Sequence, residues 1–140
     1  MSRLLALLGA VSLLTTVAAH AETITFKANL SGGAEVPPKV TDGKGTTTAT
    51  LDTATKMLTY SEDYTGLTGP ATAAHLHGPA EPGANAPVVV PFASAASPIQ
   101  GSTTLTDAQM ADLMAGKLYA NVHTATNPAG EIRGQLTRAQ

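Results

Sequence analysis

Three histidines, His75, His77 and His123, are the side chains whose type and spacing best suit chemistry in this sequence. His75 and His77 are separated by one residue, so on a β-strand both imidazoles point to the same face. Small residues precede this pair and Gly78-Pro79 follows it, which leaves room for the rings. Neutral imidazoles bind Cu(II) and Zn(II) well. The pattern therefore predicts a three-histidine site for copper, with zinc as the alternative metal.

Other kinds of reactive site find less support. The chain contains no cysteine, which excludes thiol catalysis and thiolate metal sites. It has neither a Gly-x-Ser-x-Gly elbow nor a glycine-rich phosphate loop. Glu62 and Asp63 are adjacent, so on a strand they face opposite ways, and we expect them at a solvated hairpin edge. Glu131 and Arg133 would share one face of the last strand, either as an ion pair, which we favour, or as a charged rim around the histidines.

The elements that must position these residues are predicted to be strands. Short alternating segments rich in Thr, Val and Ala are separated by Gly, Pro, Asn and Asp. One helix is expected between Thr106, which begins a capping box with Gln109, and Gly116. This pattern predicts an all-β fold, an antiparallel Greek-key sandwich or barrel with one short helix. The expected strands are 23–30, 45–51, 57–64, 71–77, 88–90, 99–105, 118–123 and 131–137.

The N-terminal residues 1–21 are predicted to be a cleavable secretory signal peptide. Arg3 supplies a positive start, residues 4–17 form an apolar run, and Ala19-His20-Ala21 is a small-x-small cleavage pattern. The apolar run is shorter than the roughly 20 residues of a membrane-spanning helix. We therefore expect cleavage near Ala21, no membrane span, a single domain over residues 22–140, and a periplasmic or secreted location.

The charge of the chain limits its partners. The formal net charge is −2, and loss of Arg3 with the signal peptide would make it −3. Nucleic acids and anionic membranes select basic patches, so neither is an expected partner. A metal ion, and superoxide or another small anion, are the partners that the histidines suggest.

Four segments, in order along the chain, resemble the CHRD domain, a module first described in chordin and found in exported bacterial proteins. This resemblance extends from residue 27 to residue 136 and implies an extracytoplasmic domain. In animals the family is associated with extracellular signalling antagonists, which implies protein binding. The matching segments are Leu30–Pro38 (LSGGAEVPP), Ala74–Gly78 (AHLHG), Leu118–Thr124 (LYANVHT) and Asn127–Leu136 (NPAGEIRGQL).

The histidine pattern is also similar, more loosely, to the copper site of copper/zinc superoxide dismutase, a Greek-key sandwich. That similarity implies an immunoglobulin-like or superoxide-dismutase-like fold, copper ligation by the three histidines, and Arg133 as the residue that guides an anion. No histidine follows His77 in the zinc-loop position and no disulfide can form, so it implies a mononuclear copper site. Candidates for fixing the histidine tautomers are Glu35, Asn121 and Glu131.

Two functions follow as hypotheses. The first is an exported copper-binding protein with a mononuclear three-histidine site, which either sequesters copper or dismutates superoxide; enzymatic turnover is left open. The alternative is a non-catalytic extracytoplasmic module that binds a protein partner, in which the histidines are structural.

Overall fold

The structure, a computed structural model, describes residues 20–140. The predicted signal peptide therefore lies almost wholly outside the described residues. The described part contains nine strands, a 3-10 turn η1 (Gly32–Ala34) and one α-helix, α1 (Asp107–Met114). The strands are β1 (Thr23–Ser31), β2 (Lys44–Asp52), β3 (Met57–Thr65), β4 (Ala71–His77), β5 (Val88–Pro91), β6 (Ile99–Thr104), β7 (Tyr119–Thr124), β8 (Ile132–Gln135) and β9 (Thr137–Arg138).

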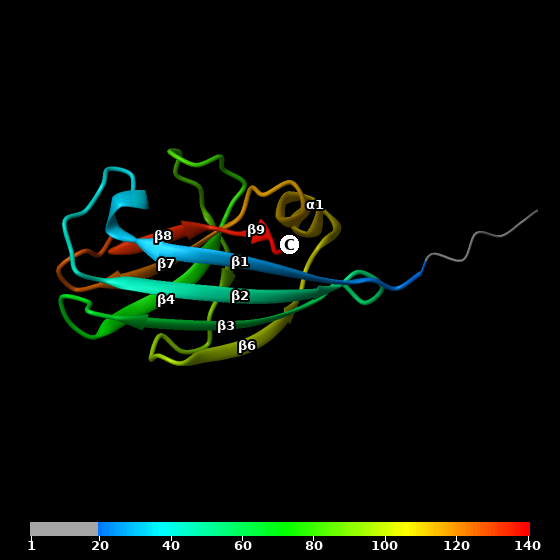
Figure 1. Ribbon diagram of the computed structural model, residues 1–140, viewed down its shortest axis with the longest axis horizontal. Coiled ribbons are helices and arrows are strands. Elements are labelled where there is room, and N and C mark those ends of the chain that lie inside the picture. The colour runs from blue at the N-terminus through cyan, green and yellow to red at the C-terminus, as the bar shows by residue number, and fades with distance from the viewer. Residues whose placement is uncertain (1–19) are drawn as a thin grey trace, which may run out of the picture.

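All strand pairs are antiparallel, and the sheet runs in the order β5-β4-β7-β8-β1-β2-β3-β6, with β9 added beside β1. This sheet curls so that β1, β2, β3 and β6 face β4, β7 and β8 (Figure 1). Strands β5 and β6 are the two edge strands of this sheet. They do not pair with each other in the described chain, so the barrel is nearly but not completely closed. The predicted all-β fold with one short helix is confirmed.

Alternation of apolar and polar residues explains β1 to β3. In β1 the residues Ile24, Phe26, Ala28 and Leu30 are buried, and most of those between them are exposed. Successive strand residues point to opposite faces, so these apolar side chains enter the barrel and form the core with partners from the other strands. The strand predicted over residues 131–137 is instead two, because the chain leaves β7 after Gln135 and pairs with β1.

Strand β7 differs from its neighbours because all six of its residues are buried. Its inner face carries Ala120 and Val122, which belong to the apolar core. Its outer face carries Tyr119, Asn121 and His123, which loops cover. A strand buried on both faces places polar side chains in a water-poor layer, where each requires a partner.

Glu62 is the clearest departure from the prediction for the hairpin edge. It faces the barrel interior and is fully buried, whereas Asp63 is exposed on the other face. The Thr47 hydroxyl donates to Glu62 Oε2 at 2.7 Å, and Oε1 is buried without a hydrogen-bond partner. Burial raises the pKa of Glu62 to about 7, against the lowering effect of the Thr47 hydrogen bond. The opposite orientation of the two carboxylates is confirmed, but the solvated position of Glu62 is wrong.

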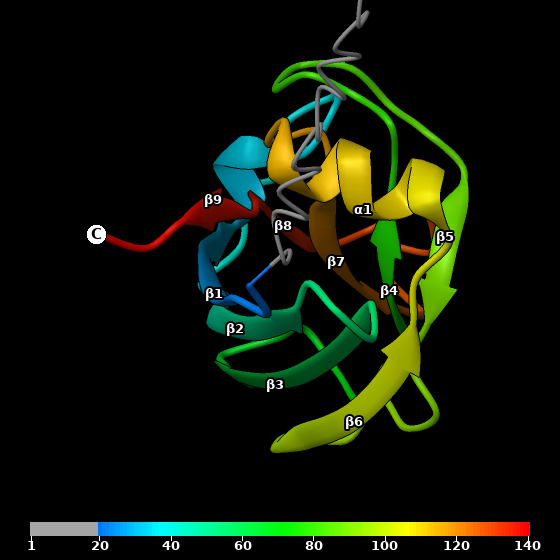
Figure 2. The ribbon, with the colours of Figure 1, turned by 90° about the vertical axis from the view of Figure 1, so that its right-hand side faces the viewer.

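Helix α1 covers one end of the barrel (Figure 2) and inserts Leu113 into the core. The predicted capping box is present: the Thr106 hydroxyl accepts from the Gln109 amide at 3.1 Å, and the Thr106 amide donates to Gln109 Oε1 at 3.0 Å. Gly116 follows the helix with φ +73°, a left-handed conformation that glycine adopts without strain. In residues 20–140 no helix has the length and apolar character needed to cross a bilayer.

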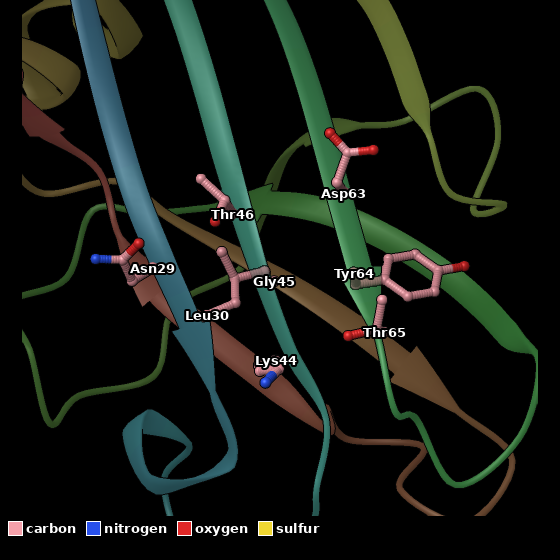
Figure 3. Close-up of a pocket in the computed structure, with 8 residues that line it drawn as sticks. All are labelled: Asn29, Leu30, Lys44, Gly45, Thr46, Asp63, Tyr64 and Thr65. Carbon is pink, nitrogen blue, oxygen red and sulfur yellow. The ribbon is translucent and has the colours of Figure 1, made fainter.

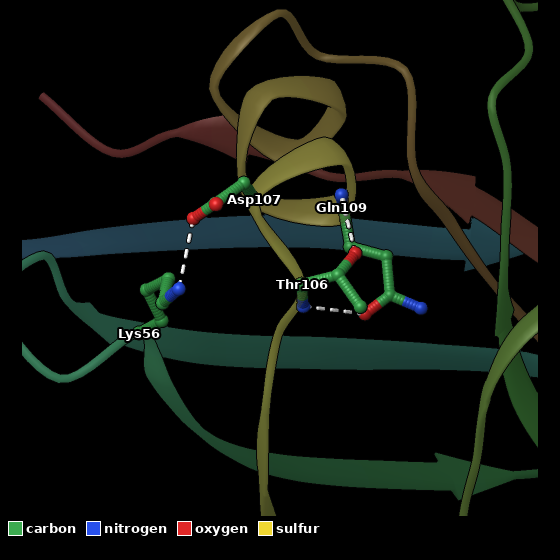
Figure 4. Close-up of polar contacts among 4 residues, drawn as sticks. All are labelled: Lys56, Thr106, Asp107 and Gln109. Atoms are coloured by element: carbon green, nitrogen blue, oxygen red, sulfur yellow. Dashed lines mark hydrogen bonds and ion pairs between the residues drawn. The ribbon is translucent and has the colours of Figure 1, made fainter.

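Replacing Thr106 with alanine is expected to lower the free energy of unfolding by about 1 kcal/mol, because the hydroxyl that accepts from the Gln109 backbone amide is lost. Urea unfolding followed by circular dichroism measures the change. The exposed Lys56–Asp107 ion pair (2.8 Å, Figure 4) provides a control. Asp107→Asn should cost less than Thr106→Ala, since exposed ion pairs contribute little. The reverse order would contradict the capping interpretation.

Candidate metal centre

The three predicted ligands come together on the outer face of β4 and β7. The antiparallel register pairs His75 with Asn121, His77 with Tyr119 and Ala73 with His123. His75 and His77 therefore share a face, as the spacing predicted, and small Ala73 stands beside His123. One potential ligand atom from each imidazole lies within 4.8 Å of the others. The ring centroids are 4.9 Å apart for His75 and His123 and 5.4 Å apart for His75 and His77.

Backbone carbonyls orient two of the imidazoles. His77 Nδ1 lies 2.9 Å from the carbonyl oxygen of Ala86, and His123 Nδ1 lies 3.0 Å from that of Pro128. A carbonyl only accepts, so each Nδ1 carries the hydrogen and each Nε2 keeps its lone pair. His123 Nε2 is 3.1 Å from His75 Nδ1, which must then donate to it. The tautomers of His77 and His123 are therefore those that a metal requires.

Burial favours the neutral imidazoles. Burial is the main factor that lowers the pKa of His77, and the neighbouring His123 and Arg133 lower it further, whereas the Ala86 carbonyl opposes the change. The pKa of His75 is also lowered, by burial and then by the other two histidines. His77 Nε2 is buried and has no hydrogen-bond partner in the described residues. An uncompensated buried lone pair is costly unless a ligand occupies the site.

Tyr119 joins His77 to Arg133. The rings of Tyr119 and His77 stack with centroids 5.0 Å apart and planes 4° apart. The Arg133 guanidinium lies over the Tyr119 ring, with Cζ 3.5 Å from the centroid. Because β7 runs between β4 and β8, the imidazole and the guanidinium pack on Tyr119 from opposite sides. The Tyr119 hydroxyl also accepts from the Ala86 amide at 3.0 Å. This hydrogen bond holds Ala86, whose carbonyl orients His77.

Glu35 and Asn121 lie together; Asn121 is on β7, opposite His75 in the register and two residues before His123. The Asn121 side-chain amide donates to Glu35 Oε1 at 2.5 Å and to the Ile132 carbonyl at 2.8 Å. Burial raises the pKa of Glu35 to about 7, although Asn121 and Arg133 act to lower it. Within residues 20–140, neither side chain hydrogen-bonds to an imidazole. The hydrogen bonds of Glu35 and Asn121 hold the segment that follows β1 against β7 and β8. These two side chains therefore support the position of the histidines only through the backbone.

Glu131 anchors the loop that follows His123. It is fully buried and accepts four hydrogen bonds, from the hydroxyls of Thr41, Thr68 and Thr124 and from the Thr68 amide, at 2.6 to 2.9 Å. Burial alone would raise the pKa of Glu131, but the hydrogen bonds from the threonines outweigh it and lower the pKa to about 2.

The ion pair that we favoured between Glu131 and Arg133 is wrong: in residues 20–140 no ion pair joins them. The threonine hydroxyls satisfy the carboxylate, and Arg133 donates to Asn85 Oδ1 at 3.1 Å and to the Ala84 carbonyl at 2.6 Å. Arg133 is separated from the histidines by Tyr119, so the guanidinium does not face them.

The carbonyls of Ala86 and Pro128 are the parts of the site that sequence reasoning missed. Both belong to loops, and a backbone acceptor leaves no trace in the residue type. Gly130 gives a partial signal, because its φ of +127° favours glycine and an added Cβ would lie 2.7 Å from both Asn121 Nδ2 and Glu35 Oε1. Pro128 lies in a turn that the Gly130 amide closes by donating to the Asn127 carbonyl at 3.0 Å.

A surface depression lies away from the histidines. It occupies about 440 Å³ on the outer face of β1, β2 and β3 (Figure 3). Its side chains project outward from three neighbouring strands and include Thr46, Asp63 and Thr65, all of which are exposed. It contains no cluster of metal-ligating side chains, in contrast to the outer face of β4 and β7.

The fold and the histidine centre thus define an all-β domain with a candidate metal site. The model of the CHRD domain family matches residues 26–136. The chain therefore belongs to the CHRD-domain family, and the predicted resemblance is confirmed over nearly the same range. Comparisons with curated proteins and with solved structures gave no match. CHRD domains occur in extracellular proteins, which agrees with the expected class of location.

Proposed function

We propose that this CHRD domain binds a single copper ion through His75, His77 and His123 in an extracytoplasmic compartment. The observation that carries this proposal is the convergence of three imidazoles whose ligand atoms lie within 4.8 Å of one another. His77 Nε2 has no hydrogen-bond partner in the described residues, and His123 Nε2 has a lone pair that His75 Nδ1 now approaches at 3.1 Å. The lowered pKa values of His75 and His77 keep both rings neutral to a more acidic pH than usual.

The donor set favours copper over other ions. Three nitrogen ligands without a carboxylate suit Cu(II) or Zn(II) better than the hard cations Mg²⁺ and Ca²⁺. Divalent copper binds a given nitrogen site more tightly than the other first-row metals do. Zinc remains the alternative, and a tetrahedral zinc site with three histidines is common.

The residues present fit such an ion after a small movement. Two nitrogens bound to one metal at about 2 Å can be at most about 4 Å apart. Ligand atoms that lie up to 4.8 Å apart must therefore approach one another slightly to share one ion. His75 must also give up its hydrogen bond to His123, so that both nitrogens can offer lone pairs. His75 is the more exposed of the three and is suited to this rearrangement.

Copper sequestration is the form of this function that the geometry favours. When bound, copper would supply the ability to cycle between Cu(I) and Cu(II), which superoxide dismutation needs. The residue expected to guide an anion, Arg133, is 2% exposed and is held by Tyr119, Asn85 and Ala84. A guanidinium fixed behind an aromatic ring is poorly placed to attract an anion to the histidines.

The test is a Cu(II) titration of the purified protein, followed by electron paramagnetic resonance. We expect one equivalent of copper with a nitrogen-rich signal. His75→Ala and His123→Ala should each weaken binding by more than the roughly 10- to 100-fold that loss of an outer-shell partner costs. Circular dichroism should show an unchanged β fold. Gln100→Ala, an exposed change on β6, is the control and should leave the affinity unchanged.

Two outcomes would overturn the proposal. Copper binding that survives both histidine substitutions would place the ion elsewhere on the chain. Absence of a stoichiometric signal would favour the alternative, a non-catalytic module that binds a protein partner. Unfolding of the variants would assign the histidines a structural role.

A further inference from the structure

A second pocket lies on the side of Tyr119 that faces away from the histidines. It occupies about 380 Å³ between the segment that follows β1 and the loop between β4 and β5. That volume is within the lower range of small-molecule sites in proteins. Its walls are apolar and include Val36, Pro38 and Pro82, and its polar lining consists of Glu35, Arg133 and Gln135.

The charged groups of this pocket are built into the fold. Arg133 is 2% exposed and Glu35 is 5% exposed, so both are among the buried charged residues of the described chain. The Asn85 side chain accepts from Arg133 and donates to the Val36 carbonyl at 3.0 Å, which ties the two walls together. The walls and the guanidinium are therefore held before any ligand arrives.

Arg133 has hydrogen-bonding capacity left over. Its guanidinium has five N–H groups, and the described residues provide two acceptors for it, Asn85 Oδ1 and the Ala84 carbonyl. Glu35 forms no ion pair with it in residues 20–140. A buried cation without a paired anion is unfavourable, and a guanidinium matches a carboxylate particularly well.

The balance of charge also favours an anion. Lys39 lies near enough to influence the Glu35 carboxyl, as Arg133 does, so two cations surround one acid. Burial keeps a fraction of that acid protonated near neutral pH. A protonated carboxyl donates a hydrogen bond, and it would then add to the donors in the pocket.

We propose that the pocket formed by Glu35, Val36, Pro38, Pro82, Arg133 and Gln135 binds a small organic carboxylate. The carboxylate pairs with Arg133, and the apolar part of the ligand packs against Val36, Pro38 and Pro82. This site is independent of the copper proposal, because none of its lining residues is one of the three histidines.

Three probes of similar size and different charge test the proposal: butyrate, butyramide and butylammonium. Each is titrated into the purified, ¹⁵N-labelled protein, and the backbone amide shifts of Gly33, Glu35 and Gly83 are followed. We expect saturable shifts with butyrate, at least about tenfold weaker binding of butyramide, and no saturation with butylammonium. Equal binding of butylammonium, or no saturation with butyrate, would overturn the proposal.

Substitutions locate the binding. Ala34→Trp fills the mouth of the pocket without touching a charged group and should abolish the butyrate shifts. Arg133→Gln should do the same, and Ala34→Trp keeps the test valid if that variant does not fold. Lys27→Gln, an exposed cation of β1 outside the pocket lining, is the control and should change the affinity less than about threefold, since exposed charges are screened. Butyrate binding that persists in Ala34→Trp would disprove this location. Copper titrations of the same variants separate a failure here from a failure of the histidine site.

Discussion

Replacing Glu131 with leucine is expected to destabilise the folded chain by about 2 to 4 kcal/mol, because the hydroxyls and the amide around this buried carboxylate lose their acceptor. The substitution removes the acceptor of four hydrogen bonds, whose donors are the buried Thr124, the partly buried Thr41 and the exposed Thr68. Each buried polar group that loses its partner costs about 1 to 3 kcal/mol. Urea unfolding at pH 7 measures the loss.

Glutamine at position 131 should be much less damaging. Its amide oxygen can accept from two of the four donors, and the threonine hydroxyls can rotate to accept from its NH₂ group. Glu81→Leu, at an exposed carboxylate, is the control and should change the stability by at most about 0.5 kcal/mol. A loss below about 1 kcal/mol for Glu131→Leu would show that the threonines find other partners.

Acid should reproduce part of this effect. The pKa of Glu131 falls to about 2 in the folded chain from an ordinary value of 4.5. A lowered carboxyl pKa means that the unfolded chain binds the proton first as the pH falls. The contribution of Glu131 is therefore complete above pH 4.5 and is lost progressively between pH 4.5 and pH 2. The advantage of wild type over Glu131→Gln should shrink across this window.

The difference in stability between wild type and Glu62→Gln is expected to depend on pH in the opposite direction to that of Glu131→Gln. The pKa of Glu62 rises to about 7 when the chain folds, so the folded state holds a proton that the unfolded state releases above pH 4.5. The stability from this group is therefore complete below pH 4.5 and is lost as the pH rises towards 7. Between pH 4 and pH 8, wild type should lose roughly 3 kcal/mol relative to Glu62→Gln.

The difference in unfolding free energy between wild type and Glu62→Gln reports on the Glu62 carboxyl alone, because all other ionisable groups titrate in both proteins. Unfolding free energies at pH 4, 6 and 8 would provide the profile. Asp63→Asn, next in sequence and exposed, should not change the pH dependence by more than about 0.5 kcal/mol. Parallel profiles for wild type and Glu62→Gln would mean that water reaches the Glu62 carboxylate.

Local signals predicted the strands, the helix and the histidine face. The Thr106 capping box needs only the first turn of one helix, and the shared face of His75 and His77 follows from strand periodicity alone. The approach of His123 to that pair depends on the register of β4 and β7, which strand periodicity alone does not set.

The two buried glutamates could not be predicted in the same way. Strand alternation places Glu62 on the same face as the buried Leu58 and Tyr60, but an acidic residue gives no reason to expect the inner face. Glu131 accepts hydrogen bonds from threonines of distant segments, Thr41 and Thr68, and does not pair with the expected arginine. The way the loops fold over the sheet determines such partners, and short-range sequence patterns do not predict that arrangement.

The burial of β7 on both faces gives the domain two interiors that share one strand. The inner one is largely apolar and is sealed by the sheet, whereas the outer one is polar and is closed by loops that side-chain contacts help to hold. Loops of this kind open at lower free energy than strands separate. An ion held by the histidines, as proposed, would therefore exchange through partial, reversible opening while the barrel stays folded, and its loading would not need to coincide with folding.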